Sequence, residues 1–545
     1  MLRFGLIFLL LVGLLLGAFA WSGNVRSGRA DFTFINRGEV GTLDPNRMSW
    51  VQDIRIGFGL WEGLYGMDPQ TLAPIPGVAK RIDITNRDTL YTFHLRDDAR
   101  WSNGDQVTAQ DFVFAWRRML EEPGDYTYLF YAVKGAQQYS EDFGAAKPAD
   151  FATVGIKARD ETTLEVALAH PVVYFPDLCA FTPFWPLHEK SMRSFRDPRS
   201  HSYAKAFTRP PNLVTNGAYR LTVWNFHEKL RLEANPYYWD RTNVKSRSID
   251  VLIGTDPMWS FLKYDSGAVD WLTDATGSIG SELYARKRPD MHVFPGFGTY
   301  FYSLNCQEKL SDGRPNPFRD VRVRKAFALA VKRQPIVDSI TRLGEATACS
   351  FIPPGVFPGY HPPDQRLEDV LRARELLAQA GYPQGKGFPQ ISILFNGEFQ
   401  HGDIAQYVRR QWLENLGVDV GLEQLEIKTF REDLKKRKYA VARASWSGDY
   451  NDVSTFMDYF RSNSENNDAG WISVEYDKLL DEASVEADAQ KRLRIFERAE
   501  RLLIQEQPII PLYHYVNACL FRDNVAGLYL NPRNTVMLKA VEVRR

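Results

Sequence analysis

One long apolar run, at the N-terminus, restricts what this chain can become. Residues 4–19 carry no charge, begin just after the positively charged Arg3, and lead into Ala18-Phe19-Ala20, the small-x-small pattern of a signal-peptide cleavage site. No later stretch is long and apolar enough to span a bilayer. We therefore expect a secretory signal peptide over residues 1–20, cut before Trp21, and an exported body that folds in water.

An uncleaved N-terminal membrane anchor is the alternative, because the apolar run approaches the length that spans a bilayer. No cysteine follows the run, which argues against a lipid anchor. The four cysteines are not in CxxC spacing, and export permits disulfides. Cys306 and Cys349 are the pair to test first, and buried free thiols are the other possibility.

The 545 residues predict several domains, because single hydrophobic cores stop growing at roughly 250–300 residues. Strand-like and helix-like segments alternate, and residues 391–395, 404–416 and 418–422 read as a β-α-β unit with parallel strands. The fold class we expect is mixed α/β and α+β, in at least two lobes. Lobed proteins of this kind often bind ligands between their domains.

Local signals place further elements. Thr108 to Asp111 resembles a capping box that opens a helix over residues 112–120. Gly381 is suited to end a helix over residues 371–380. The remaining predictions are strands at 89–95, 163–168 and 249–253, a hairpin of 217–224 with 229–233, a helix at 321–332, and a long helical region at 475–505.

Charge and motifs exclude several classes of function. Basic and acidic residues balance at 67 each, so nothing indicates a nucleic-acid partner. The sequence lacks an HExxH zinc pair, a GxSxG nucleophile elbow and a GxxxxGK[ST] phosphate loop. We therefore expect a protein that is not an enzyme and that needs no cofactor and no metal.

The most informative segment runs from residue 443 to residue 452. Arg443, Trp446 and Asp449 recur every three residues, but Gly448 and the residues after it are turn-rich, so we expect a strand end that leads into a loop. Such a loop could hold a zwitterion, with Asp449 on an ammonium, Arg443 on a carboxylate and Trp446 against apolar atoms. A buried Arg–Asp ion pair beside a core tryptophan explains the residues equally well.

A chain-wide set of motifs separates these alternatives. Residues 91–96, 101–104 and 107–112 read YTFHLR, WSNG and VTAQDF, and LDP at 43–45, WEGL at 61–64, VTNGAY at 214–219 and YVNA at 515–518 accompany them in order. Together they resemble the oligopeptide-binding proteins of bacterial ABC importers, in solute-binding protein family 5. The resemblance spans nearly the whole chain after the signal peptide.

The resemblance implies a role for each candidate residue. Asp449 would bind the peptide's N-terminal ammonium, and Arg443 and His401 would help to receive its C-terminal carboxylate. Four further positions would lie near the ligand: Asn396, Trp446, Tyr515 and, on a strand over 299–305 beside the peptide, Tyr300. Ser303, Phe301 and Ile427 depart from close relatives, which leaves the preferred peptide length and side-chain pockets open.

The resemblance also implies the architecture and the partners. It implies a hinged two-lobe clam of three domains, which comprise residues 31–61 with 201–297 and 517–545, residues 62–200, and residues 298–516. The protein would be a periplasmic monomer that delivers short peptides to an ABC permease in the cytoplasmic membrane. Two alternatives remain: a binding protein for another solute, such as a dipeptide, nickel, haem or an opine-like molecule, and an exported hydrolase.

Overall fold

A computed structural model describes residues 28–197, 202–364, 368–398 and 400–545 of the chain. The predicted signal peptide, residues 1–20, lies outside the described residues. Across the described ranges, no helix combines the length and the apolar character that crossing a membrane requires.

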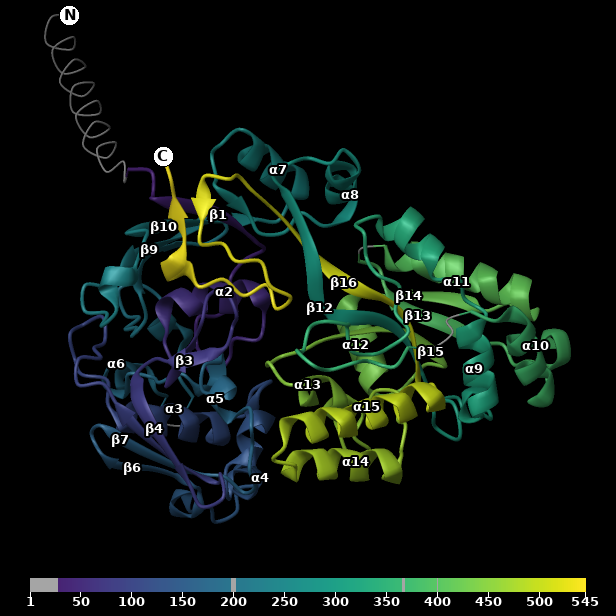
Figure 1. Cartoon of the computed structure of the whole chain (residues 1–545), viewed down its shortest axis with the longest axis horizontal. Coiled ribbons are helices and arrows are strands. Elements are labelled where there is room, and N and C mark those ends of the chain that lie inside the picture. Colours follow the sequence, from purple (N-terminus) through teal and green to yellow (C-terminus); the bar gives the residue numbers. More distant parts are fainter. Residues whose placement is uncertain (1–27, 198–201, 365–367, 399) are drawn as a thin grey trace, which may run out of the picture.

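Two lobes make up the structure, and two long strands run from one lobe into the other (Figure 1). These strands are β12 (Met291–Leu304) and β16 (Ile509–Phe521), which pair antiparallel along most of their length. The first lobe contains the elements before β12 and after β16, and the second lobe contains the elements between them. The register of the pair shifts between Pro295 and Thr299, so the ladder is irregular in mid-strand.

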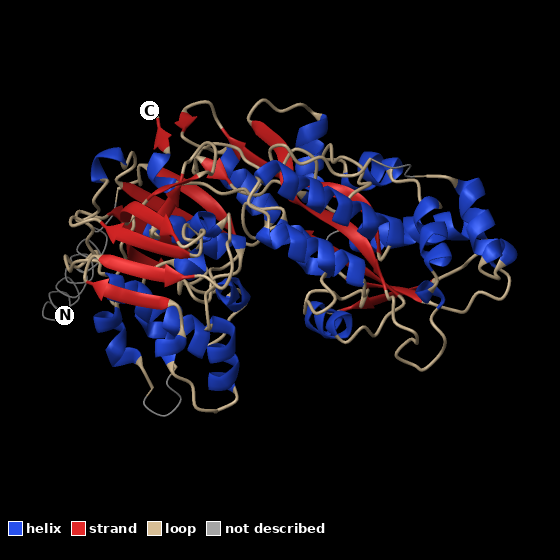
Figure 2. Ribbon diagram, turned by 60° about the horizontal axis from the view of Figure 1, so that its bottom comes forward, coloured by secondary structure: helices blue, strands red, loops and turns tan. Residues whose placement is uncertain are grey.

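One ten-stranded mixed sheet therefore extends through both lobes (Figure 2). Its spatial order is β14 (Gly421–Leu425), β13 (Ser392–Asn396), β15 (Val441–Ser447), β12, β16, β11 (Trp271–Leu272), β1 (Phe32–Arg37), β10 (Ser248–Gly254), β9 (Lys229–Ala234) and β8 (Tyr219–Asn225). Its pairs are parallel at β1–β10, β1–β11, β13–β14 and β13–β15 and antiparallel elsewhere.

The first lobe adds a four-stranded antiparallel sheet and seven of the described helices. The sheet has the order β4 (Ala79–Thr85), β5 (Leu90–Leu95), β7 (Thr163–Ala167) and β6 (Ile156–Asp160). The helices are α2 (Val51–Leu60), α3 (Ala109–Glu121), α4 (Ala136–Gly144), α5 (Phe175–Leu178), α6 (Glu189–Met192), α7 (Pro257–Asp265) and α8 (Gly277–Ala285). Short pairs are β2 (Tyr65–Met67) with β3 (Pro74–Pro76), and β17 (Val525–Ala526) with β18 (Glu542–Val543).

Helices cover both faces of the sheet in the second lobe (Figure 2). They are α9 (Val321–Leu329), α10 (Val370–Gln379), α11 (His401–Leu416), α12 (Ile427–Lys435), α13 (Ser454–Met457), α14 (Val474–Val485) and α15 (Ala489–Glu506). Alternate residues of β12 serve different cores, as strand geometry requires. Tyr300 and Tyr302 belong to a core with Trp412 of α11, whereas Phe301 belongs to a second core with Phe456 of α13.

Most local predictions are confirmed. The hairpin is β8–β9, the β-α-β unit is β13–α11–β14 with parallel strands, and Thr108 and Asp111 form a capping box at the start of α3. The region predicted to be helical at 475–505 is helical but is divided into α14 and α15, because the Asp488 side chain accepts a hydrogen bond from the Lys491 amide and begins the second helix. Cys306 and Cys349 are not joined by a disulfide.

Candidate ligand-binding site

The candidate residues come mainly from three neighbouring strands. In the large sheet β15 lies beside β12, and β12 lies beside β16, so Arg443, Tyr300 and Tyr515 lie on adjacent strands. His401 is the first residue of α11. As predicted, β15 ends at Ser447 and leads into a loop that carries Asp449.

Arg443 lies among phenol rings at one end of this group. One of its Nη atoms donates a hydrogen bond to the Tyr515 hydroxyl (3.3 Å), and its guanidinium carbon lies 5.1 Å from the centre of the Tyr300 ring. Its Nε atom is buried and has no hydrogen-bond partner in the described structure. Among the described residues no carboxylate forms an ion pair with Arg443. A cation enclosed in this way can accept an anionic group from a ligand.

His401 belongs to the same cluster. Its Nδ1 atom and the Tyr300 hydroxyl share a hydrogen bond of 3.3 Å, and the two rings lie 5.5 Å apart. Burial, together with the charge of Arg443, lowers the pKa of His401 to about 3. The imidazole is therefore neutral at pH 7 and can offer a hydrogen bond but not a charge to a ligand.

Asp449 lies at the junction of the two lobes. Its carboxylate accepts hydrogen bonds from the hydroxyls of Tyr126 (3.2 Å) and Tyr128 (3.0 Å), which belong to the first lobe. Its amide donates to the Thr455 hydroxyl at 2.8 Å, which fixes the start of the loop. Burial raises the pKa of Asp449 to about 6, although both tyrosine hydrogen bonds and the charge of Arg533 oppose that rise.

The other residues of the loop over 449–452 make further contacts between the lobes. Tyr450 is only 2% exposed, belongs to the hydrophobic core of the first lobe, and stacks on Tyr174 at 4.9 Å. The Asn451 amide donates to the Asp177 carboxylate at 3.4 Å. Asp452 instead pairs with Arg492 of the second lobe, with 2.7 Å between Arg492 Nη2 and Asp452 Oδ1. The 449–452 loop thus inserts into the first lobe.

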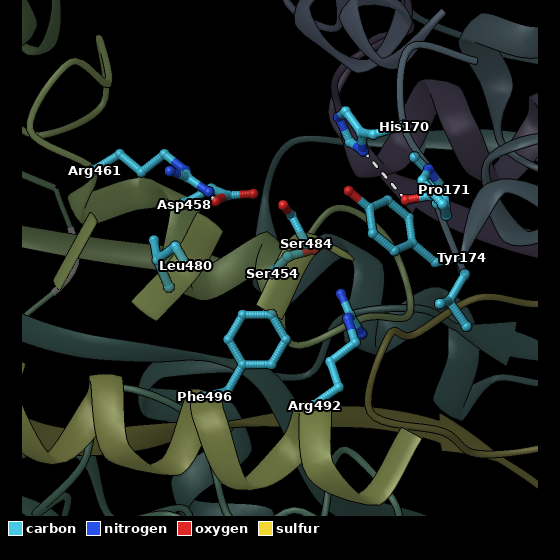
Figure 3. A pocket seen from close by; sticks show the side chains of 12 residues that line it. His170, Pro171, Tyr174, Ser454, Asp458, Arg461, Leu480, Ser484, Arg492 and Phe496 are labelled. Carbon is cyan, nitrogen blue, oxygen red and sulfur yellow. Dashed lines mark hydrogen bonds and ion pairs between the residues drawn. The ribbon is translucent and has the colours of Figure 1, made fainter. Parts of the chain in front are cut away.

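A small cavity lies beside this loop, with walls from both lobes (Figure 3). His170 and Tyr174 line it from the first lobe, and Asp458, Arg461 and Arg492 line it from the second. Its volume of about 30 Å³ has room for water molecules only. Figure 3 shows the charged side chains of the second lobe facing His170 and Tyr174 across it.

Trp446 and Asn396 do not join these clusters. Residues three apart on a strand point to opposite faces, and the Trp446 indole lies 4.8 Å from the Tyr459 ring and donates to the Thr455 carbonyl at 2.8 Å. Asn396 donates a long hydrogen bond of 3.4 Å to Glu398, while its own side-chain oxygen is buried and unbonded in the described structure. A ligand role for either side chain stays a prediction.

The buried ion pair that explained the segment equally well is absent. Throughout the described residues, no hydrogen bond or ion pair joins Arg443 to Asp449, because each faces a different set of tyrosines. The two residues are six positions apart. Because an extended chain advances about 3.4 Å per residue, at most about 20 Å separates their backbones. The site therefore offers a carboxylate, on Asp449, and a positively charged guanidinium, on Arg443, at the two ends of a short interval.

Comparison with known proteins identifies the kind of protein. Residues 73–468 match the model of the bacterial extracellular solute-binding proteins, family 5. The chain belongs to this family. It is a solute-binding protein and not an enzyme.

Relatives of this solute-binding protein carry the same fold. The periplasmic oligopeptide-binding protein OppA of Salmonella typhimurium is 34% identical over 504 residues, which are 90% of this chain and 88% of that protein. The murein tripeptide-binding protein MppA of Escherichia coli superimposes with a TM-score of 0.79 at 29% identity, over 95% of this chain and 99% of that one. Haemophilus influenzae OppA in complex with the peptide RPPGFSPFR gives 0.76 at 31%, over 94% and 99%.

Sequence reasoning missed the first-lobe residues that contact the candidate loop. Tyr126, Tyr128, Asp177 and Arg533 all contact the 449–452 loop. The Tyr128 contact joins residues 321 positions apart. No spacing pattern relates such distant positions, so the only available signal was the clustering of aromatic residues at 126–131.

Proposed function

We propose that this protein is the substrate-binding component of an ABC-type importer and that it encloses short peptides between its lobes. One observation supports the proposal most strongly. The side chains of Asp449 at the lobe junction and of Arg443 among tyrosines form no ion pair in the described structure, and they lie at two ends of one short interval. That is the arrangement that a peptide zwitterion needs, with its ammonium on Asp449 and its carboxylate on Arg443.

The distance between Asp449 and Arg443 limits the length of the peptide. An extended peptide advances about 3.4 Å per residue, so a span of at most about 20 Å accommodates up to about six residues. The strands beside the site would give main-chain hydrogen bonds, which bind any sequence. Neutral His401 and the Tyr515 hydroxyl would support the carboxylate.

Lobe closure would deliver the ligand. The shift in register between Pro295 and Thr299, within the only two long strands that connect the lobes in the described structure, supports a hinge near the expected boundary of the 298–516 domain. Closure would bury Asp449 under Tyr126 and Tyr128, and the closed monomer would dock on a permease in the cytoplasmic membrane. The named periplasmic relatives support a periplasmic location.

Relatives differ in their ligands, from a murein tripeptide to RPPGFSPFR. Dipeptides are a second candidate class, because a relative in Bacillus subtilis, 30% identical over 92% of this chain, is a dipeptide-binding protein. Calorimetry with peptides of two to six residues would rank these lengths. Each peptide would be used free, N-acetylated and C-amidated.

We expect acetylation to abolish measurable binding and amidation to weaken it. The difference follows from the structure, because Asp449 requires a cation whereas the tyrosines around Arg443 can still donate to an amide oxygen. Equal affinity for free and acetylated peptides at every length would overturn the proposal.

A further inference from the structure

Arg533 is a buried cation beside the proposed ammonium site. It lies in the first lobe between β17 and β18, and its side chain is only 8% exposed. One Nη atom lies 3.5 Å from the Asp177 carboxylate, and the other donates to the backbone carbonyl of Asp449 at 3.3 Å. The arginine thus connects two segments of the first lobe with the loop of the second lobe that carries Asp449.

Asp177 completes this contact. The carboxylate oxygen that faces Arg533 also accepts the Asn451 amide at 3.4 Å. The pair therefore binds the 449–452 loop at two backbone points, on either side of Tyr450, whose ring is buried in the first lobe. These contacts can form only when the lobes are together.

We propose that Arg533 is a positioning residue for ammonium binding, because it fixes the Asp449 loop against the first lobe and places a positive charge beside the Asp449 carboxylate on closure. The proposal rests on the proposed function. It makes closure and ligand recognition one event, since the cation that favours ionised Asp449 belongs to the opposite lobe.

The groups that face Asp449 support this role. Tyr126 and Tyr128 donate neutral hydrogen bonds, and Asp125 carries a like charge that opposes ionisation. Arg533 is the cation that lowers the pKa of Asp449 among the described groups, and Asp177 offsets part of its charge. The Arg533–Asp177 contact is long for an ion pair at 3.5 Å, so the arginine is not committed to Asp177 alone.

A pH series tests the proposal. Protonated Asp449 cannot pair with an ammonium, so peptide affinity should fall as pH decreases through about 6 in the wild-type protein. Arg533→Met removes the charge together with the hydrogen bond to the Asp449 carbonyl. The lost hydrogen bond should weaken binding at pH 7 about tenfold, and the lost charge should move the midpoint of the pH dependence upward. Arg533→Lys keeps a charge and should return the midpoint close to the wild-type value.

Two further variants distinguish an electrostatic effect of Arg533 on Asp449 from a purely mechanical effect on the loop. Asp177→Asn leaves the arginine charge unopposed, so the midpoint should move downward, and this variant also carries the test if Arg533→Met does not fold. Arg492→Met is the matched control, because Arg492 is a similarly buried arginine that pairs with Asp452 of the same loop and not with Asp449. It should leave the midpoint in place, whatever it does to affinity.

The outcomes distinguish the two proposals. If wild-type protein binds no free peptide at any pH, the proposed function fails. If wild-type protein binds with a pH midpoint that Arg533→Met leaves unchanged, or that Arg492→Met moves equally, the role of Arg533 fails while the function stands. An upward or absent shift in Asp177→Asn would also contradict that role.

Discussion

Replacing Asp449 with asparagine removes the charge on which ammonium binding depends and changes little else. Asparagine has nearly the same shape, and its side-chain oxygen can still accept a hydrogen bond from Tyr126 or Tyr128. The Asp449 amide bond to Thr455 and the Arg533 contact involve only the backbone, so the loop should keep its place. The variant therefore isolates the electrostatic contribution of the carboxylate.

The magnitude follows from the burial of the site. Because the carboxylate is covered by two tyrosines of the opposite lobe, an ammonium bound there is largely removed from water. Removing one partner of such a buried, hydrogen-bonded charge pair costs about 2–5 kcal/mol. At about 1.4 kcal/mol per tenfold change, peptide affinity should fall about 30- to 4,000-fold.

Isothermal titration calorimetry at pH 7 with one tripeptide and one tetrapeptide would measure the change. Asp125→Asn is the control, because Asp125 is an exposed carboxylate near Asp449 that makes no hydrogen bond to it. An exposed charge contributes at most about 1 kcal/mol, so this control should change affinity no more than about fivefold. Wild-type affinity in Asp449→Asn would refute the assignment of the ammonium anchor.

Three other perturbations have defined outcomes. Arg443→Met should lower the affinity for free peptides about 10- to 100-fold, because hydrogen bonds to charged groups contribute about 1.5–3 kcal/mol. In the same titration it should hardly change the affinity for C-amidated peptides, and an equal loss for both would contradict a role for Arg443 in binding the carboxylate. Tyr128→Phe should weaken binding less than about tenfold, since a neutral hydrogen bond contributes about 0.5–1.5 kcal/mol, and a loss as large as that of Asp449→Asn would be inconsistent with a supporting role. Burial raises the pKa of Glu500 to about 7 from its usual 4.5, so the folded state holds this proton more tightly than the unfolded state. The free energy of unfolding should therefore fall by up to about 3 kcal/mol as pH rises from 4.5 to 7. Glu500→Gln stays neutral, so its advantage in melting temperature over wild type should grow across that window, and a constant difference in thermal melts would exclude the titration of this group.

Local rules accounted for much of the fold. The Thr108–Asp111 capping box and the left-handed Gly381 after α10, with a φ of +98°, are set by neighbouring residues and were predictable from the sequence. The end of α14 was missed because residues 486–488 contain no glycine or proline, the usual signals of a break. The N-cap at Asp488 depends on one side-chain hydrogen bond that competes with helix continuation.

The site was predictable only in part, for a different reason. The turn-rich residues after position 447 correctly predicted that a strand ends before Asp449 and leads into a loop. The helix-like spacing of Arg443, Trp446 and Asp449 did not show that Trp446 turns to the other face, which follows from the alternation of a strand. Tyr128 and Arg533 reach the site only through the packing of one lobe on the other, which no local pattern encodes.

Identifying the ligand that the protein carries would test its function most directly. Native mass spectrometry of the protein isolated from an expressing cell, followed by denaturation and sequencing of the released molecule, requires no assumption about peptide length. We predict a mixture of short peptides with free amino and carboxyl termini, because the proposed site would pair with both terminal charges and with the peptide main chain. A single non-peptide solute, or peptides with blocked amines, would contradict the role of Asp449 and with it the proposed function.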